Sequence, residues 1–108
     1  MRLSIIPDDL AVYVDGKRAL VDMKGIPAEV HAVQWYGDHG WVEFKRNRNG
    51  QKDNKMITGL GAYAKFLTRW KDARTGDLQA VIDEIGDDPE LEQVKQRLVD
   101  EIKAVNDV

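Results

Sequence analysis

The sequence predicts an α+β fold, with a small N-terminal antiparallel sheet of hairpins packed by a helix and followed by one or two further C-terminal helices. Three observations lead to this prediction. In the first 46 residues, short apolar runs alternate with polar residues, which is typical of strands. From residue 58 onward, apolar residues recur at helical spacing. A small sheet cannot bury its apolar face alone, so a helix must cover it.

Four or five strands are expected, within residues 3–6, 11–14, 17–22, 30–35 and 41–46. The dipeptide Asp15-Gly16 lies between the second and third of these ranges. It suits a tight hairpin turn, because both central residues of that turn need a positive φ. In the last range Val42 shares one face with Phe44, whereas Trp41 points to the other. This alternation predicts a sheet that is packed on one side and solvated on the other.

Helices are expected after the strands. The first, over residues 58–74, has Thr58 as its N-cap and Gly76 as its C-terminal stop. A short helix over residues 78–85 follows, and Asp88, with proline next to it, begins the last one. The predicted organisation is a β-rich domain with its packing helix over residues 1–76. A helical extension over residues 77–108 is docked as part of the same domain.

Composition excludes several kinds of protein. The chain has 108 residues, of which 43% are hydrophobic and 32% charged, and these values are typical of a globular domain. It has no cysteine, so disulfides, thiolate metal sites and cysteine nucleophiles are all excluded. No apolar run approaches the roughly 20 residues that span a bilayer, so no membrane partner is expected. Residues 1–76 hold 13 basic and 9 acidic side chains, against 3 and 10 in residues 77–108. This asymmetry is typical of a solvated helix surface or of head-to-tail contacts.

No residue pattern points to a catalytic site, a cofactor or a metal. Ser4 is the only serine, and it does not lie in a nucleophile turn. The segment 59–61 lacks the remaining residues of a phosphate-binding loop. His31 and His39 have no further ligands at a recognised metal-binding spacing. We therefore predict a protein that is not an enzyme.

Three tryptophans are the residues with the largest contact area. Trp70 is expected to close over the sheet as a core residue. Trp35 and Trp41 flank a five-residue loop and are expected to face each other across the hairpin, unless one of them points outward and marks a partner surface. With Tyr36 they form one candidate partner-binding group.

The last helix supplies a second candidate group. Leu91, Leu98 and Val105 lie at sevenfold spacing, so this helix could pair with the same helix of another copy and form a homo-oligomer. Glu101 would then occupy a core position, which favours ordinary docking within the chain.

A basic segment follows the second predicted hairpin. It contains Lys45, Arg46, Arg48, Lys52 and Lys55, just after two aromatic residues. Single-stranded nucleic acid is held by such combinations of aromatic and cationic side chains. The pI of about 5.3, however, is far below that of a dedicated nucleic-acid-binding domain. Nucleic-acid binding is therefore the alternative prediction.

The first 46 residues resemble a group of small phage and prophage proteins that are encoded beside tail or tail-fibre genes. Four segments carry the resemblance: residues 3–9, 12–16, 23–35 and 40–44. The most specific stretch is Gly-Ile-Pro-Ala-Glu-Val-His-Ala-Val-Gln-Trp, residues 25–35. The helix bearing Trp70 is a looser match, and residues 72–108 do not follow the group's pattern.

The resemblance implies a tail-associated accessory or assembly protein that binds a tail or tail-fibre component. It implies a location in the bacterial host cytoplasm or in the virion assembled there. It carries no catalytic residues over to this chain.

Overall fold

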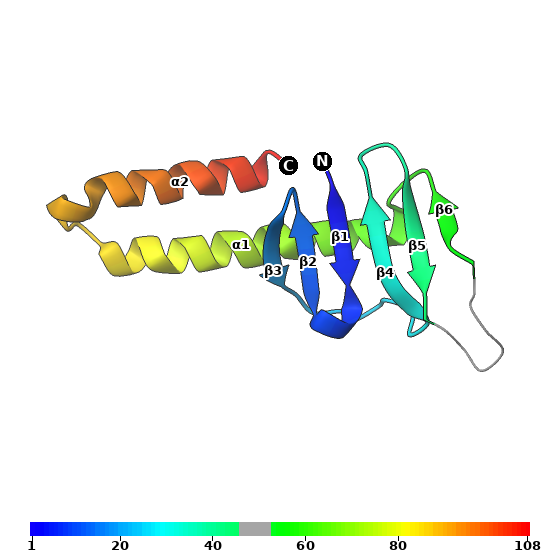
Figure 1. Ribbon diagram of the computed structural model, residues 1–108. Helices are drawn as coiled ribbons and strands as arrows, with labels where there is room; N and C mark the ends of the chain where they lie inside the picture. The colour runs from blue at the N-terminus through cyan, green and yellow to red at the C-terminus, as the bar shows by residue number, and fades with distance from the viewer. Residues whose placement is uncertain (46–52) are drawn as a thin grey trace. The chain divides into compact units, whose positions relative to one another are not determined.

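The computed structural model describes residues 1–45 and 53–108 (Figure 1). The chain forms two compact units, Met1–Trp70 and Lys71–Val108. Within the described part of the first unit, six strands form one antiparallel sheet. They are β1 (Leu3–Ile6), β2 (Ala11–Val14), β3 (Lys17–Leu20), β4 (Val30–Trp35), β5 (Gly40–Phe44) and β6 (Lys55–Ile57). The predicted α+β fold is thus confirmed.

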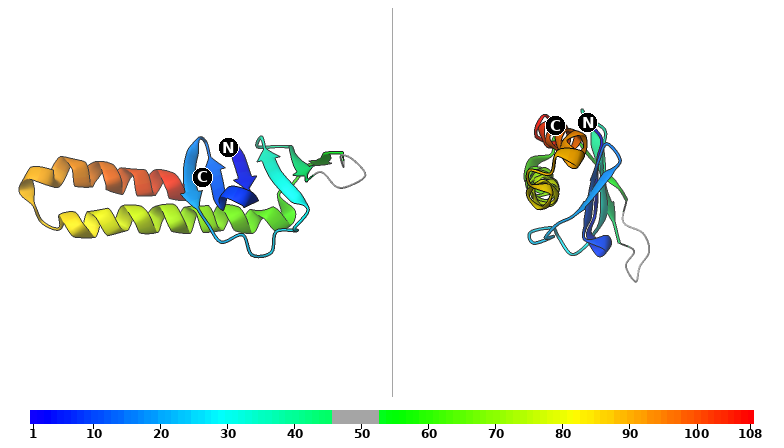
Figure 2. Two further views of the ribbon diagram at one scale, coloured as in Figure 1. Left: turned by 60° about the horizontal axis from the view of Figure 1, so that its bottom comes forward. Right: turned by 90° about the vertical axis from the view of Figure 1, so that its left-hand side faces the viewer.

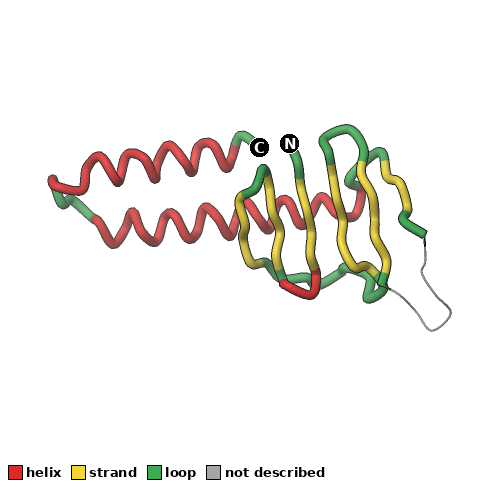
Figure 3. Tube along the Cα trace, in the orientation of Figure 1, coloured by secondary structure: helices red, strands yellow, loops and turns green. Residues whose placement is uncertain are grey.

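The first strand of the chain lies in the middle of the sheet. The strand order is β3-β2-β1-β4-β5-β6, and every neighbouring pair is antiparallel (Figure 1). Figure 3 draws the same sheet in yellow beside the red helices. Two meanders, β1-β2-β3 and β4-β5-β6, therefore meet along the β1–β4 ladder, where Leu3 pairs with Trp35 and Ile5 with Val33.

The tight turns follow the local sequence. Asp15 and Gly16 both have positive φ, 49° and 82°, as the primed turn between β2 and β3 requires. At the start of β4 the register against β5 shifts between Val30 and Ala32, so His31 is the extra residue of a β-bulge and its side chain is exposed.

The beginning of helix α1 (Ala64–Ile85) packs against one face of the sheet, as Figures 1 and 2 show. Phe66 and Trp70 on this helix are fully buried. The Nε1–H group of Trp70 donates a hydrogen bond to the carbonyl oxygen of Lys17 on β3 at 2.8 Å. Arg69 donates to the carbonyl oxygens of Asp22 and Lys24, which fastens the chain after β3 to the helix. The helix thus covers the apolar face as the sequence predicts.

Two predictions about the helix boundaries were wrong. Thr58 is not an N-cap, because a 3-10 turn, Gly61–Tyr63, precedes α1 and the helix begins at Ala64. Gly76 does not end the helix, which continues to Ile85 and merges the two predicted helices into one. A glycine inside a helix costs only about 1 kcal/mol, and the favourable residues on either side outweigh it.

The unit Lys71–Val108 is a helical hairpin. Helix α1 ends at Ile85, and Gly86 follows with a positive φ of 60°. Helix α2 (Glu92–Asn106) then runs back beside the end of α1 (Figures 1 and 2). Asp88 acts as a cap, as predicted, but of a 3-10 turn, Pro89–Leu91: it accepts a hydrogen bond from the Glu90 N–H at 3.0 Å. The α-helix itself begins later than predicted, at Glu92.

Candidate partner-binding surface

The face of the sheet opposite α1, called the open face below, carries one continuous row of side chains. In an antiparallel sheet, residues that pair directly point to the same face. The registers therefore align one residue from every strand across the open face. In strand order from β3 to β6 this row is Arg18, Tyr13, Ser4, Gln34, Trp41 and Met56.

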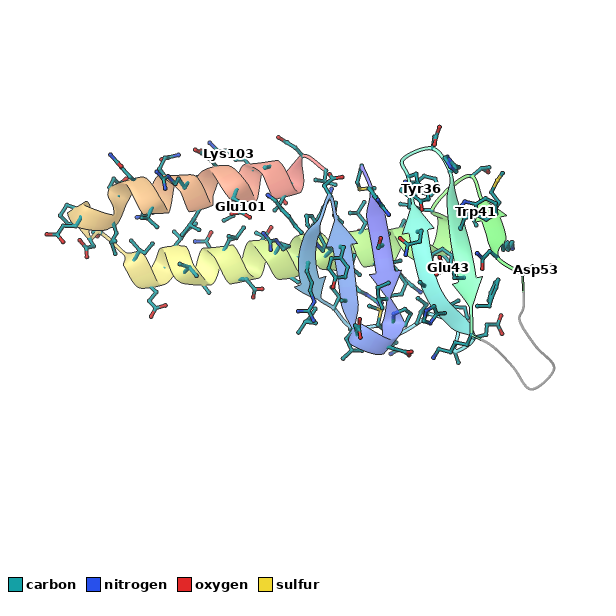
Figure 4. All side chains as sticks on the ribbon, viewed as in Figure 1. Tyr36, Trp41, Glu43, Asp53, Glu101 and Lys103 are labelled. Atoms are coloured by element: carbon teal, nitrogen blue, oxygen red, sulfur yellow. The ribbon has the colours of Figure 1, made fainter. Side chains whose placement is uncertain are left out.

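The β5 end of this row is apolar and exposed. Trp41 is 38% exposed and lies directly opposite Met56, which is 54% exposed. Figure 4 shows Tyr36 and Trp41 on the viewer's side of the sheet, and Tyr36 is also exposed. Trp41 belongs to the solvated face, as the alternation in its strand predicts. An exposed tryptophan beside other large apolar side chains is typical of an interaction surface.

Trp35 lies on the other face. It pairs with Gly40, not with Trp41, and it is only 6% exposed. The expectation that the two tryptophans face each other was therefore wrong, because Trp41 pairs with Gln34 one position along the ladder. Trp35 is a core residue, and of the predicted group only Trp41 and Tyr36 lie at the surface.

A polar cluster lies at the end of the open face beside the β4–β5 turn. Tyr36 stacks on His39 with the ring centroids 5.5 Å apart, and the Arg2 guanidinium lies 5.2 Å from the centre of the Tyr36 ring. His39 Nδ1 is 2.6 Å from an oxygen of Asp38. This hydrogen bond and the adjacent imidazole charge hold the pKa of Asp38 below its ordinary value. The cluster thus places the side chains of Arg2 and His39 against the Tyr36 ring.

A groove of about 400 Å³ lies on the same face, over β2, β1 and β4. It is lined by Arg2, Ser4, Ile6, Tyr13, Gly16 and Gln34. Sequence reasoning did not identify these residues. The alternation of Arg2, Ser4 and Ile6 was visible in the sequence, but it does not reveal that β4 lies beside β1 and brings Gln34 next to Ser4.

The second candidate group lies on the helical hairpin. Leu91 is 38% exposed in the turn before α2, and Leu98 is half-buried. Glu101 pairs with Arg74 of α1 at 2.5 Å. The negative charge of Glu101, which would disturb the core of a coiled coil between two copies, is thus paired inside the hairpin of one chain. Pairing with a second copy stays a prediction.

The basic segment is only partly within the described residues. Arg46, Arg48 and Lys52 lie outside them. The Lys45 ammonium pairs with Asp8 at 3.1 Å. Lys55 pairs with Val42 and therefore lies on the α1 side of the sheet, opposite to Trp41. The described residues do not bring Trp41 and Lys55 onto one face, as a nucleic-acid platform would require.

The two histidines lie at opposite ends of the β4–β5 hairpin. His31 is in the bulge at the start of β4, and His39 precedes Gly40 beyond its end. Several strand residues at about 3.3 Å each separate them, whereas two histidines on one zinc ion lie within a few ångströms of each other. Within residues 1–45 and 53–108, no three acidic or histidine side chains are grouped so that they could hold a metal ion.

A second hollow, of about 330 Å³, is lined by residues of β4, β5 and β6 together with Tyr63. Glu29, Lys55 and Tyr63 are among the residues that line it. Burial raises the pKa of the Tyr63 phenol, and the negative charge of Glu29 raises it further.

Replacing Glu29 by glutamine is expected to lower the pKa of Tyr63 toward its ordinary value, because the carboxylate charge that disfavours phenolate is removed. Absorbance titration of phenolate in a Tyr13→Phe, Tyr36→Phe background would measure this. Because the folded state raises this pKa, Tyr63 stabilises the fold below pH 10, and this contribution is lost as the pH rises through the folded pKa. An unchanged Tyr63 titration in the Glu29→Gln protein would contradict this assignment.

Comparison of the chain with family models, with curated proteins and with solved structures gave no match. Among the described residues, neither helix has the length and apolar character needed to cross a bilayer.

Proposed function

We propose that the protein is a non-enzymatic accessory or assembly protein of a phage or prophage tail, which binds a protein partner through the open face around Trp41. The exposure of Trp41 in a row that crosses all six described strands carries this proposal. The resemblance of residues 3–46 to proteins encoded beside tail genes supplies the context. The protein works in the bacterial host cytoplasm or in the particle that is assembled there.

The side chains of this surface are positioned by the sheet before a partner binds. Trp41 and Met56 are side chains of paired strands, so their backbones are fixed by the ladder before any partner arrives. Tyr36 is held by its contacts with Arg2 and His39. Rigid aromatic side chains lose little conformational entropy on binding, and they dominate the binding energy of many interfaces. The surface therefore has the properties of a preorganised contact site.

Replacing Trp41 by threonine is expected to weaken partner binding about 30-fold, the loss of roughly 2 kcal/mol that is typical of a central tryptophan. Threonine keeps the strand propensity, so the sheet is retained. The tail and tail-fibre proteins encoded beside the gene would be co-expressed with it one at a time. Affinity would then be measured by calorimetry on the complex that co-purifies.

The matched control is Val94→Thr on α2, because Val94 is also an exposed apolar residue but lies on the helical hairpin. It is expected to leave the affinity unchanged. The proposal fails if Trp41→Thr binds like the native protein or if Val94→Thr alone abolishes binding. It also fails if the neighbouring genes encode metabolic enzymes and no tail protein binds.

A further inference from the structure

We propose that the groove over β2, β1 and β4 binds a carboxylate of an acidic peptide segment, and that this segment belongs to the protein that covers Trp41. The inference rests on the proposed protein-binding function of the open face, and it names the chemistry of the partner. It follows from the convergence of unpaired hydrogen-bond donors on the groove.

Three side chains present donors to the groove. Ser4 Oγ donates to Gln34 Oε1 at 2.6 Å, which occupies the amide oxygen and leaves the Gln34 NH₂ group as the available donor. Among the described residues, neither this NH₂ group nor the Tyr13 hydroxyl has a hydrogen-bond partner. Arg2 also lines the groove, and its guanidinium adds a positive charge. The groove thus offers donors and a positive charge to an acceptor-rich ligand.

The position of Arg2 is set by the β2–β3 turn. Its N–H donates to Asp15 Oδ1 at 2.8 Å, and its carbonyl oxygen accepts from the Asp15 N–H at 2.8 Å. The turn thus holds the backbone of Arg2 from both sides, while the guanidinium rests on the Tyr36 ring. The guanidinium carbon lies 5.2 Å from the centre of that ring. A guanidinium presents N–H groups in a planar fork, which can bind a carboxylate in a bidentate manner. One oxygen of the Asp15 carboxylate accepts the hydrogen bond from the Arg2 N–H.

An acidic peptide fits this face better than nucleic acid. Nucleic acid is bound through many phosphates, and each needs its own cation. The groove lining contains one cation, Arg2. Outside the groove, this face carries Arg18 opposite Tyr13 at one side and Glu43 beyond Trp41 at the other (Figure 4). A single arginine, two neutral donors and neighbouring apolar side chains match one carboxylate followed by apolar residues. The size of the groove is in the range of small ligand sites.

The test is a titration of the ¹⁵N-labelled full chain with three probes: a capped tetraglutamate peptide, its tetraglutamine counterpart and a single-stranded oligothymidylate. Tetraglutamate is expected to shift the side-chain amide signals of Gln34 and the signals of Arg2, and tetraglutamine is not. Arg2→Gln should weaken tetraglutamate binding roughly tenfold, as expected for a hydrogen bond to a charged group. Raising the salt to about 0.5 M should weaken it as well, because the site is exposed.

The matched control is Lys55→Gln, which removes one positive charge from the opposite face of the same sheet and should leave tetraglutamate binding unchanged. Arg2→Lys keeps the charge but loses the planar fork, so its affinity should lie between those of the native protein and Arg2→Gln. The inference is overturned if tetraglutamine binds equally well, if Lys55→Gln has the same effect as Arg2→Gln, or if the oligonucleotide binds more tightly at the same residues.

The test of the groove and the test of the proposed function can fail independently of each other. Peptide binding at Arg2 without any tail partner would support the groove and contradict the tail assignment. Binding of a tail protein that depends on Trp41 but not on Arg2 would support the tail assignment and contradict the groove.

Discussion

Replacing Trp70 by alanine is expected to lower the free energy of unfolding by about 3–5 kcal/mol, the cost of removing a large aromatic side chain from a packed core. Trp70 is 1% exposed, and its ring lies between the start of α1 and the sheet, where its Nε1–H group bonds to Lys17. Alanine would leave a cavity under the sheet and remove the partner of the Lys17 carbonyl. Urea denaturation followed by circular dichroism would measure the loss.

Two further variants separate the loss of the hydrogen bond from the loss of the buried side chain. Trp70→Phe keeps most of the buried area but loses the hydrogen bond, so a smaller loss of about 1–2 kcal/mol is expected. Trp41→Ala removes the same side chain from the open face and should cost less than about 1 kcal/mol, as for other cross-strand pairs. If Trp70→Ala were no more destabilising than Trp41→Ala, the placement of Trp70 in the core would be wrong.

Replacing Gly40 by alanine is expected to lower the free energy of unfolding by roughly 3 kcal/mol, at the upper end of the usual cost of overpacking. A Cβ atom at Gly40 would lie 2.3 Å from the carbonyl oxygen of Gln34 and 3.0 Å from the Trp35 ring. The first of these is a backbone atom, so the β4–β5 hairpin itself would have to shift. Glycine is thus required here mainly because the Gln34 carbonyl oxygen occupies the space of a Cβ atom, and the Trp35 ring closes it further.

Replacing Gly76 by alanine should instead raise the free energy of unfolding. Gly76 lies inside α1, and a Cβ built there would meet no described atom within 4 Å apart from its chain neighbours and the nearby backbone of the helix itself. Alanine is expected to stabilise the protein by about 0.5–1 kcal/mol, because it reduces the entropy of the unfolded chain and favours the helix. Thermal denaturation of both variants would check the pair. A stabilised Gly40→Ala protein, or a destabilised Gly76→Ala protein, would contradict the described packing.

The strands were predictable from sequence because their signals are local. Alternation located β1, β2 and β4, and Asp15-Gly16 located the turn. Strand β6 was missed, because it has three residues and follows a long polar segment that shows no alternation. The order of the strands depends on which edges meet after folding, and no local pattern encodes that.

The candidate surface was predictable only in part, for the same reason. Alternation placed Trp41 on the solvated face, and this is confirmed. Alternation could not show that Trp35 lies on the buried face, because that depends on the register in which Trp35 pairs with Gly40 rather than with Trp41. The groove combines Arg2, Tyr13 and Gln34 from three strands, so it exists only once the two meanders have joined.

The central position of β1 has a consequence for how the chain folds. The pairs within each meander are closer in sequence than those of the β1–β4 ladder, so we expect each meander to form faster than the ladder that joins them. The β1–β4 ladder, called the seam below, joins residues more than 25 positions apart. Forming it closes a long loop of chain, which includes Ile26, and this costs conformational entropy. We therefore expect the rate-limiting step to be the zipping of Leu3–Ile5 against Val33–Trp35. Substitutions at this seam would slow refolding, whereas those at the outer strands would mainly speed unfolding.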